Sequence, residues 1–284
     1  MGANGRRLCA VVDLKHKTLN IERMMIVEQM LKNAQTPLLH IADVSGSALF
    51  QGDCLDIMPL IPDNSIDMIL ADLPYGTTAC KWDTIIPFEP LWKQYKRIIK
   101  DNGAIVLTAS QPFTSALVMS NPDWFKYEWI WEKSHPTGFA SSKYNPLKYH
   151  ESVLIFCEGK TVYNPQMTKG KPNHSMGKIV NGGQIKSESQ VNITAIQSQQ
   201  SENKFPKSVQ KFSNPRFKGM HPTQKPVALF EYLIKTYTNE NDLVLDNTMG
   251  VGTTCLGAKE LNRKFIGIEK EVKYYDLAVA RVFG

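Results

Sequence analysis

The chain has 284 residues, 42% of them hydrophobic, so it can bury the core of one large α/β domain with an insertion or of two small domains. It has no run of about 18 apolar residues, so no membrane span is expected, and no long apolar stretch follows the basic N-terminus as in a signal peptide. The five cysteines are scattered without a C-x-x-C pair, which argues against a disulfide framework and a structural zinc site and favours a cytoplasmic location.

The formal net charge of +6 is unevenly distributed. Between Lys160 and Lys218 there are ten basic residues and two acidic ones, whereas the rest of the chain is slightly acidic. A concentrated positive charge is typical of a surface that meets a polyanion such as a nucleic acid. A solvated basic loop is the alternative, because loops rich in Lys, Ser and Gln are common.

Hydrophobic periodicity predicts alternating helices and strands along most of the chain. Helices are expected at 20–34, 91–100, 111–120, 226–237 and 254–261, with a last helix at the C-terminus. Strands are expected at 48–53, 65–72, 103–109, 125–131, 151–157, 243–246 and 264–268. Between about 159 and 219 the pattern breaks down, which indicates an inserted or partly disordered segment. The alternation indicates an α/β fold with a doubly wound, mostly parallel, Rossmann-like sheet.

A glycine turn near the C-terminus follows the buried strand 243–246 and precedes a helix. Gly250 and Gly252 allow a sharp turn and a close approach of the backbone to a ligand. The next strand ends in Glu269, 17 residues after Gly252, where an acid can accept both hydroxyls of a ribose. This combination predicts a nucleoside-cofactor site.

The details of the turn favour a cofactor without a pyrophosphate. Cys255 stands where a dinucleotide fingerprint has its third glycine, and no Lys follows Thr253 and Thr254 as in a P-loop. A ligand with adenosine but no phosphate fits better, and S-adenosylmethionine is the candidate.

A second motif, Asp72-Leu73-Pro74-Tyr75, follows a predicted strand and therefore lies at the ligand-binding edge of the sheet. The exocyclic amine of adenine or cytosine is a poor nucleophile because its lone pair is delocalised into the ring. The Asp72 carboxylate and the Leu73 carbonyl can accept its two hydrogens, which aims the lone pair at a methyl donor, while Tyr75 stacks on the base. A strand end followed by a Pro-containing turn is the alternative explanation of this tetrapeptide.

The order of motifs resembles that of the β-class amino-group DNA methyltransferases. Their D-P-P-Y, H-P-T-Q-K-P and D-P-F-x-G-x-G-T-T motifs are similar to Asp72–Tyr75, His221–Pro226 and Asp246–Thr254, in the same circularly permuted order. The resemblance covers roughly 47–284. It implies a catalytic half at 46–158, a basic target-recognition insertion at 159–219 and a cofactor-binding half at 220–284, after an N-terminal helical extension at 1–45.

The resemblance also implies a role for each matching position. Asp72, Leu73, Pro74 and Tyr75 would hold a base flipped out of double-stranded DNA. The residues implied to bind S-adenosylmethionine are Asp53, Cys54, Asp72, His221, Pro222, Thr223, Lys225, Asp246, Thr248, Gly250, Gly252, Thr253, Thr254 and Glu269. No metal site is implied. A homodimer and a cognate restriction enzyme are the further partners, in a bacterial or phage-infected cytoplasm.

Two departures from the family pattern affect the expected pocket. Leu73 replaces a proline, which keeps the carbonyl but weakens the rigid backbone that aims it. Asn247 and Thr248 replace Pro-Phe, which removes an aromatic side chain beside the cofactor. A further segment, 135–139, is expected to form a mobile loop over the site.

Adenine N6 methylation of DNA is the main functional hypothesis. Cytosine N4 methylation is the first alternative, although family members acting on cytosine often have Ser at the position of Asp72. RNA adenine methylation remains open, and a comparison of duplex DNA with RNA separates it. A protein substrate, a nicotinamide oxidoreductase and a DNA-binding protein without catalysis fit the motifs less well; binding of NAD but not S-adenosylmethionine would favour the oxidoreductase.

Overall fold

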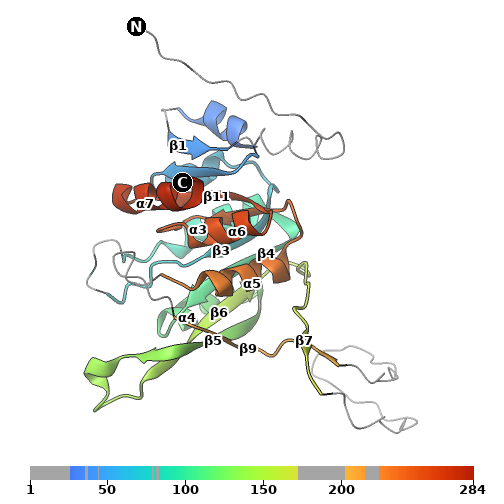
Figure 1. The fold of residues 1–284 in the computed structure, drawn as a ribbon. Helices are drawn as coiled ribbons and strands as arrows, with labels where there is room; N and C mark the ends of the chain where they lie inside the picture. Colours follow the sequence, from blue (N-terminus) through green and yellow to red (C-terminus); the bar gives the residue numbers. More distant parts are fainter. Residues whose placement is uncertain are drawn as a thin grey trace. The chain divides into compact units, whose positions relative to one another are not determined.

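A computed structural model describes seven parts of the chain: residues 26–35, 38–43, 45–78, 80, 83–171, 202–214 and 224–284. The chain divides into two compact units. The larger unit comprises 1–164 and 208–284, and the smaller one comprises 165–207. Figure 1 shows the ribbon with the elements labelled.

The larger unit is built on a sheet whose described strands have the order β1-β2-β11-β10-β3-β4-β6-β5-β9. These are β1 Leu39–Ala42, β2 Ala48–Gln51, β3 Ile66–Ala71, β4 Ile99–Ala109, β5 Phe125–Thr137, β6 Lys148–Phe156, β9 Val209–Phe212, β10 Leu243–Asp246 and β11 Lys264–Glu269. Five neighbouring strands, β2, β11, β10, β3 and β4, are parallel to one another. Strand β6 is antiparallel to both β4 and β5. This confirms the prediction of a mostly parallel sheet.

Both faces of the sheet are covered by helices, because the central strands are apolar on both sides (Figure 1). In β3, Ile69 and Ala71 belong to one core cluster, whereas Met68 and Leu70 belong to the other. The first cluster includes residues of α2 Cys54–Ile57, α3 Phe88–Ile98 and α4 Phe113–Ser120, and the second includes residues of α5 Val227–Tyr237, α6 Thr253–Glu260 and α7 Val272–Phe283. The sheet is therefore doubly wound, as predicted.

The strand register brings together the ends of four strands that are far apart in the sequence. Leu245 of β10 pairs with Ile69 of β3, Asp246 pairs with Gly267 of β11, and Glu269 pairs with Gln51 of β2. The segments that follow β2, β3, β10 and β11 thus emerge at one edge of the sheet. In an open α/β sheet this carboxyl edge is where ligands bind.

The structure differs from the sequence prediction at the end of β5. The segment 135–137, expected to start a mobile loop, continues the strand, and Thr137 pairs with Lys148 of β6. The chain turns at Gly138, whose φ of 89° favours glycine, and a 3₁₀ helix, η2, covers Phe139–Ser141. Figure 1 shows this hairpin in green, projecting beyond the rest of the sheet. We call residues 134–150 the arm.

The smaller unit contains one pair of short strands among its described residues, β7 Thr168–Lys169 and β8 Asn203–Lys204, which are antiparallel. This unit, 165–207, spans fewer residues than the insertion expected at 159–219. Residues 208–214 belong to the larger unit, because β9 pairs in parallel with β5 and half-buried Phe212 packs against Tyr232. None of the helices in the described ranges has the length and apolar character needed to cross a bilayer.

Candidate active site at the carboxyl edge of the sheet

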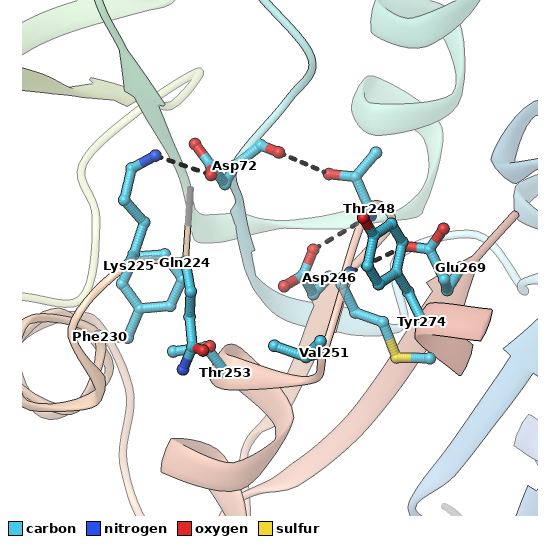
Figure 2. Close-up of a pocket in the computed structure, with 12 residues that line it drawn as sticks. Asp72, Gln224, Lys225, Phe230, Asp246, Thr248, Val251, Thr253, Glu269 and Tyr274 are labelled. Carbon is cyan, nitrogen blue, oxygen red and sulfur yellow. Dashed lines mark hydrogen bonds and ion pairs between the residues drawn. The ribbon is translucent and has the colours of Figure 1, made fainter. Parts of the chain in front are cut away.

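Two cavities adjoin each other at the carboxyl edge and share Thr248 and Glu269 in their walls. The smaller, of about 90 Å³, is lined by Asp72, Gln224, Lys225, Phe230, Asp246, Thr248, Met249, Gly250, Val251, Thr253, Glu269 and Tyr274 (Figure 2). The larger, of about 310 Å³, is lined by Gly52, Asp53, Cys54, Leu55, Pro74, Thr84, Ile85, Ile86, Pro87, Asn247, Thr248, Glu269, Lys270 and Glu271. Most residues that the sequence predicted for a cofactor line one of them.

Asp72 lies directly after β3, and its carboxylate accepts hydrogen bonds from three side chains. Tyr75 Oη donates to Oδ1 at 2.8 Å, and Thr108 Oγ1 donates to the same oxygen. Lys225 Nζ donates to Oδ2 at 2.7 Å, an ion pair shown in Figure 2. An ionised carboxylate offers about four acceptor positions, so these contacts leave one for a further donor.

Lys225 is almost completely buried, with 6% of its side chain exposed. Burial alone would lower the pKa of Lys225, but the carboxylates of Asp72 and Glu151 raise it above the ordinary value. The ammonium group also lies 5.3 Å from the centre of the Tyr75 ring. The family resemblance implied that Lys225 binds the cofactor. In the structure its ammonium contacts Asp72, and the residue also lines the smaller cavity.

Tyr75 is held on two sides. Its ring stacks on Phe113 of α4, with centroids 5.1 Å apart and planes 24° from parallel. Burial, with the negative charge of Asp72, raises the pKa of its hydroxyl well above the ordinary value, so Tyr75 is a neutral hydrogen-bond donor to Asp72. Its backbone leads into a turn fixed by Asp83, whose carboxylate accepts the amides of Gly76, Thr77 and Thr78. Asp83 therefore shapes the loop that follows the catalytic motif.

The glycine turn between β10 and α6 has two residues in the left-handed region, Gly250 with φ 53° and Gly252 with φ 74°. A side chain at Gly252 would also lie 3.0–3.2 Å from Val282 and Ala278 of α7. Arg281 of α7 secures the turn, because its guanidinium donates to the Val251 carbonyl and to Thr253 Oγ1, both at 3.1 Å. The turn is thus fixed by its own glycines and by α7.

Asp246, the last residue of β10, is buried at the base of the smaller cavity. Its carboxylate accepts Thr254 Oγ1 at 2.5 Å and the Thr248 amide at 3.1 Å. Burial raises the pKa of Asp246 to about 7, although these hydrogen bonds act in the opposite direction. An acid with this pKa is about half ionised at neutral pH, so its carboxylate can pair with a positively charged group of a ligand.

Glu269 stands at the end of β11, between the two cavities. Its carboxylate accepts the Gly250 amide at 2.9 Å and the Glu271 amide at 2.7 Å, and burial raises its pKa. Asp53, in the larger cavity, caps α2 by accepting the Leu55 amide at 2.9 Å and pairs with Lys270 at 3.1 Å. Burial raises the pKa of the neighbouring Cys54 thiol to about 11, so it remains uncharged at neutral pH.

Thr248 connects the two motifs that are furthest apart in sequence. Its hydroxyl donates to the backbone carbonyl of Asp72 at 3.2 Å, as Figure 2 shows. Asn247, beside it, accepts a hydrogen bond from buried Tyr95 of α3 at 2.6 Å. Asn247 and Thr248, which replace Pro-Phe of the family pattern, therefore help to position the turn. Tyr274 of α7 brings an aromatic side chain to the smaller cavity.

The remaining predicted residues fall into three groups. Pro74 lines the larger cavity, and Leu73 is buried in the core beneath the site. His221, Pro222 and Thr223 lie outside the described residues. Sequence reasoning missed Thr108 and Arg281, which contact the motifs from β4 and α7; the position of Thr108 near the end of a strand beside β3 was a usable signal.

The cavities fit a bipolar nucleoside such as S-adenosylmethionine. The larger cavity combines the apolar side chains of Ile85, Ile86 and Pro87 with the Asp53 carboxylate, as a planar base requires. Glu269 stands where the two cavities meet, the position for a ribose. The smaller cavity contains the Asp246 carboxylate for an ammonium group and extends to Asp72.

A sequence model of the DNA methylase family matches residues 66–280, about three quarters of the chain. The chain belongs to this family. The Type II methyltransferase M.HinfI of Haemophilus influenzae is 30% identical to this methylase over 263 residues, which cover 83% of this chain and 68% of the relative. The Type II methyltransferase M2.MboI of Moraxella bovis is 29% identical over 258 residues, covering 82% and 86%.

Solved structures of methyltransferases share the fold of this methylase. The M1.HpyAVI–SAM complex is 25% identical, with a TM-score of 0.57, and the similarity covers 82% of this chain and 98% of the other. The PvuII DNA methyltransferase, which is cytosine-N4-specific, has the same TM-score at 17% identity and covers 82% and 85%. The α/β methyltransferase fold predicted from the sequence is thereby confirmed.

Proposed function

We propose that this methylase transfers a methyl group from S-adenosylmethionine to the exocyclic N6 of an adenine flipped out of double-stranded DNA. The observation that carries the proposal is the position of Asp72. Its carboxylate retains an acceptor position, and it lines the same cavity as Asp246, Gly250 and Glu269. An acceptor for an amine and a site for a methyl donor thus adjoin each other.

S-adenosylmethionine is the ligand of the M1.HpyAVI complex, and the two cavities of this methylase have room for its two ends. The adenine would lie against Ile85 and Pro87 near Asp53, the ribose at Glu269 and the methionine group beside Asp246. In this placement the ammonium of the methionine group faces a carboxylate. His221, Pro222 and Thr223 complete the proposed binding set by resemblance.

The chain's own residues would activate the amine by geometry and charge. The Asp72 carboxylate and the Leu73 carbonyl accept the two N–H groups, so the nitrogen lone pair turns toward the donor. S-adenosylmethionine would supply the methyl group and leave as the thioether S-adenosylhomocysteine, and the methylated nitrogen, positively charged at first, would lose one proton to water by way of Asp72. The negative charge of Asp72 stabilises that cation, and the tyrosine of the motif, Tyr75, packs against the base.

Adenine is favoured over cytosine because Asp72 stands where cytosine-specific family members often have Ser. Cytosine N4 methylation is the second candidate, since the cytosine-specific PvuII enzyme has the same fold. RNA adenine methylation is the third. Incubation with labelled S-adenosylmethionine and equal amounts of duplex DNA and RNA tests the substrate class. Labelled DNA supports the proposal, and label confined to RNA contradicts it.

DNA recognition is proposed for the basic segment 159–219, whose positive charge suits phosphate contacts. Flipping the target base costs a few kcal/mol, which contacts in the pocket must offset. A homodimer, a cognate restriction enzyme and action in a bacterial cytoplasm complete the proposal, since the relatives are bacterial Type II methyltransferases. Sedimentation of the purified protein, alone and with DNA, tests the dimer.

A further inference from the structure

A second layer of charged side chains lies behind the catalytic carboxylate. Lys225 Nζ, which contacts Asp72, also lies 3.4 Å from Glu151 Oε2. Lys133 Nζ contacts the other oxygen of Glu151 at 2.5 Å. Asp72, Lys225, Glu151 and Lys133 therefore form a continuous chain of alternating charge, which we call the charge chain.

The charge chain is assembled from separate elements and is largely buried. Asp72 follows β3, Lys225 precedes α5, Glu151 lies in β6, and Lys133 lies in β5. Both lysines are 6% exposed and Glu151 is 13% exposed. Burial would raise the pKa of Glu151, but the two ammonium groups lower it below the ordinary value. Glu151 is thus an anion between two cations.

One carboxylate, Asp72, is enough to neutralise the charge of the buried Lys225 ammonium. The fold alone therefore does not require the second ion pair, Glu151 with Lys133. Burying a further ammonium and carboxylate has a desolvation cost that their attraction does not always repay. Glu151 lines neither cavity. A role for Glu151 in the reaction therefore has to act through Lys225.

Lys225 opposes the chemistry that Asp72 performs. The exocyclic amino group of the target base must donate a hydrogen bond to Asp72, and the carboxylate must stabilise the positive charge that develops on the nitrogen. An ammonium 2.7 Å from Oδ2 competes for that oxygen and offsets its negative charge. A second carboxylate on the far side of Lys225 reduces this competition, because it shares the cation.

Glu151 Oε2 is well placed to share it. Within the described residues this oxygen is buried and has no hydrogen bond, since 3.4 Å to Lys225 Nζ is longer than a strong charge-assisted bond. A small displacement of the ammonium toward Glu151 would form that bond. The same displacement would lengthen the contact of Lys225 with Asp72 and leave Oδ2, which already has an open acceptor position, with more of its negative charge for the base.

From this geometry we infer that Glu151 is a positioning residue of the methyl-transfer reaction: it draws the Lys225 ammonium away from Asp72 when the base binds, and Lys133 holds Glu151 in place. The inference rests on the proposed function. It predicts that the Glu151 carboxylate controls turnover, whereas binding of DNA and S-adenosylmethionine depends on other residues.

The test compares Glu151→Gln with the double variant Lys133→Met/Glu151→Gln. Glu151→Gln leaves two buried cations with one anion, so Lys225 remains on Asp72, and we expect kcat to fall about 10- to 100-fold. The dissociation constant of S-adenosylmethionine should change less than about threefold. The double variant restores neutrality but has no carboxylate to draw Lys225 away, so its kcat should stay within about threefold of that of Glu151→Gln.

Glu132→Gln is the matched control, because Glu132 lies beside Lys133 in β5 and forms an exposed pair with Lys211 at 3.2 Å. Its kcat should stay within about twofold of the parent. Thermal unfolding of each variant identifies loss of folding. A folded Glu151→Gln variant with parental kcat, or a folded double variant that recovers about tenfold or more in kcat without the Glu151 carboxylate, overturns the inference. A parent protein that methylates no DNA contradicts the proposed function instead.

Discussion

Asp72 is the residue on which the proposed chemistry depends. Its carboxylate is held by Tyr75, Thr108 and Lys225, so its orientation is fixed before a substrate arrives. Such preorganisation lowers the barrier because no reorientation is needed in the transition state. In the proposed site the glycine turn and Glu269 would bind the cofactor without using Asp72, so mutation should separate cofactor binding from chemistry.

Asp72→Ala should therefore abolish methyl transfer while leaving the affinity for S-adenosylmethionine within a few-fold of the parent. The loss should reach at least about a thousandfold in kcat, as for the removal of other preorganised charge stabilisation. Methyl incorporation into DNA and calorimetric titration of the cofactor provide the two readouts. Asp63→Ala, at an exposed ion pair with Arg97, is the control. Substantial methylation by Asp72→Ala contradicts the pocket assignment.

The pKa of about 7 at Asp246 predicts how cofactor binding depends on pH. The carboxylate is mostly ionised above pH 7, and in the proposed site that form would bind the ammonium of S-adenosylmethionine best, so bound cofactor would lower its pKa. Affinity should therefore decrease as pH falls through 7 toward 5. Asp246→Asn should bind more weakly at pH 8 and show a flatter profile. An equally steep profile in the variant would assign the dependence to another group.

At the scale of elements, the glycine turn separates two costs of adding a side chain: the strain of a left-handed backbone and a close contact with α7. Gly252→Ala forces a side chain into the left-handed region and against Val282 and Ala278, so it should destabilise the protein by about 2–3 kcal/mol. Gly250→Ala meets the same backbone penalty but has no atom within 4 Å, so it should cost only about 1 kcal/mol. Urea unfolding of both variants measures the difference, and equal costs would exclude the contact with α7.

The arm is the element that sequence reasoning interpreted wrongly. It has no acidic residue between Lys133 and Glu151, and Phe139 and Tyr144 at its tip are exposed by 64% and 86%. Strand pairing between β5 and β6 extends it, whereas its Pro and Gly residues suggested a loop. Because β5 carries Lys133 of the charge chain, the arm begins next to the active site.

Exposed aromatics among lysines suit contact with DNA bases or sugars. The double variant Phe139→Ala/Tyr144→Ala should therefore weaken binding to duplex DNA by about tenfold or more, since stacking contributes roughly 1–3 kcal/mol per base. Fluorescence anisotropy with labelled DNA gives the affinity, and cofactor binding should not change. Met119→Ala, exposed by 71% on α4, is the control for loss of a surface apolar group. Parental DNA affinity in the arm variant would exclude this contact.

At the scale of the whole molecule, the sequence was sufficient to predict the sheet and the partnership of Asp72 with the glycine turn. Buried strands such as 243–246 followed by helices leave few alternatives, and the motif order determined which strand ends had to meet. It could not predict that Lys225 contacts Asp72, because that depends on where β3 and the start of α5 lie in space. Glu151 was missed for the same reason.

The arrangement of the sheet explains how the sequence motifs can occur in a permuted order. β10 inserts between β3 and β11, so the C-terminal turn lies beside a motif from the first third of the chain. The sheet buries the same apolar surface wherever the chain begins and ends. The order of the motifs still carries information, because it distinguishes this family from dehydrogenases that open with their glycine turn.

The proposed activity is tested most directly by nucleoside mass spectrometry of DNA from cells that express the chain, compared with DNA from cells that express Asp72→Ala. We expect N6-methyladenine in the first DNA and its absence in the second, in a host lacking its own adenine methylation. N4-methylcytosine in place of N6-methyladenine would contradict the choice of base. DNA without either modification, from cells that contain the folded protein, would contradict the proposed activity itself.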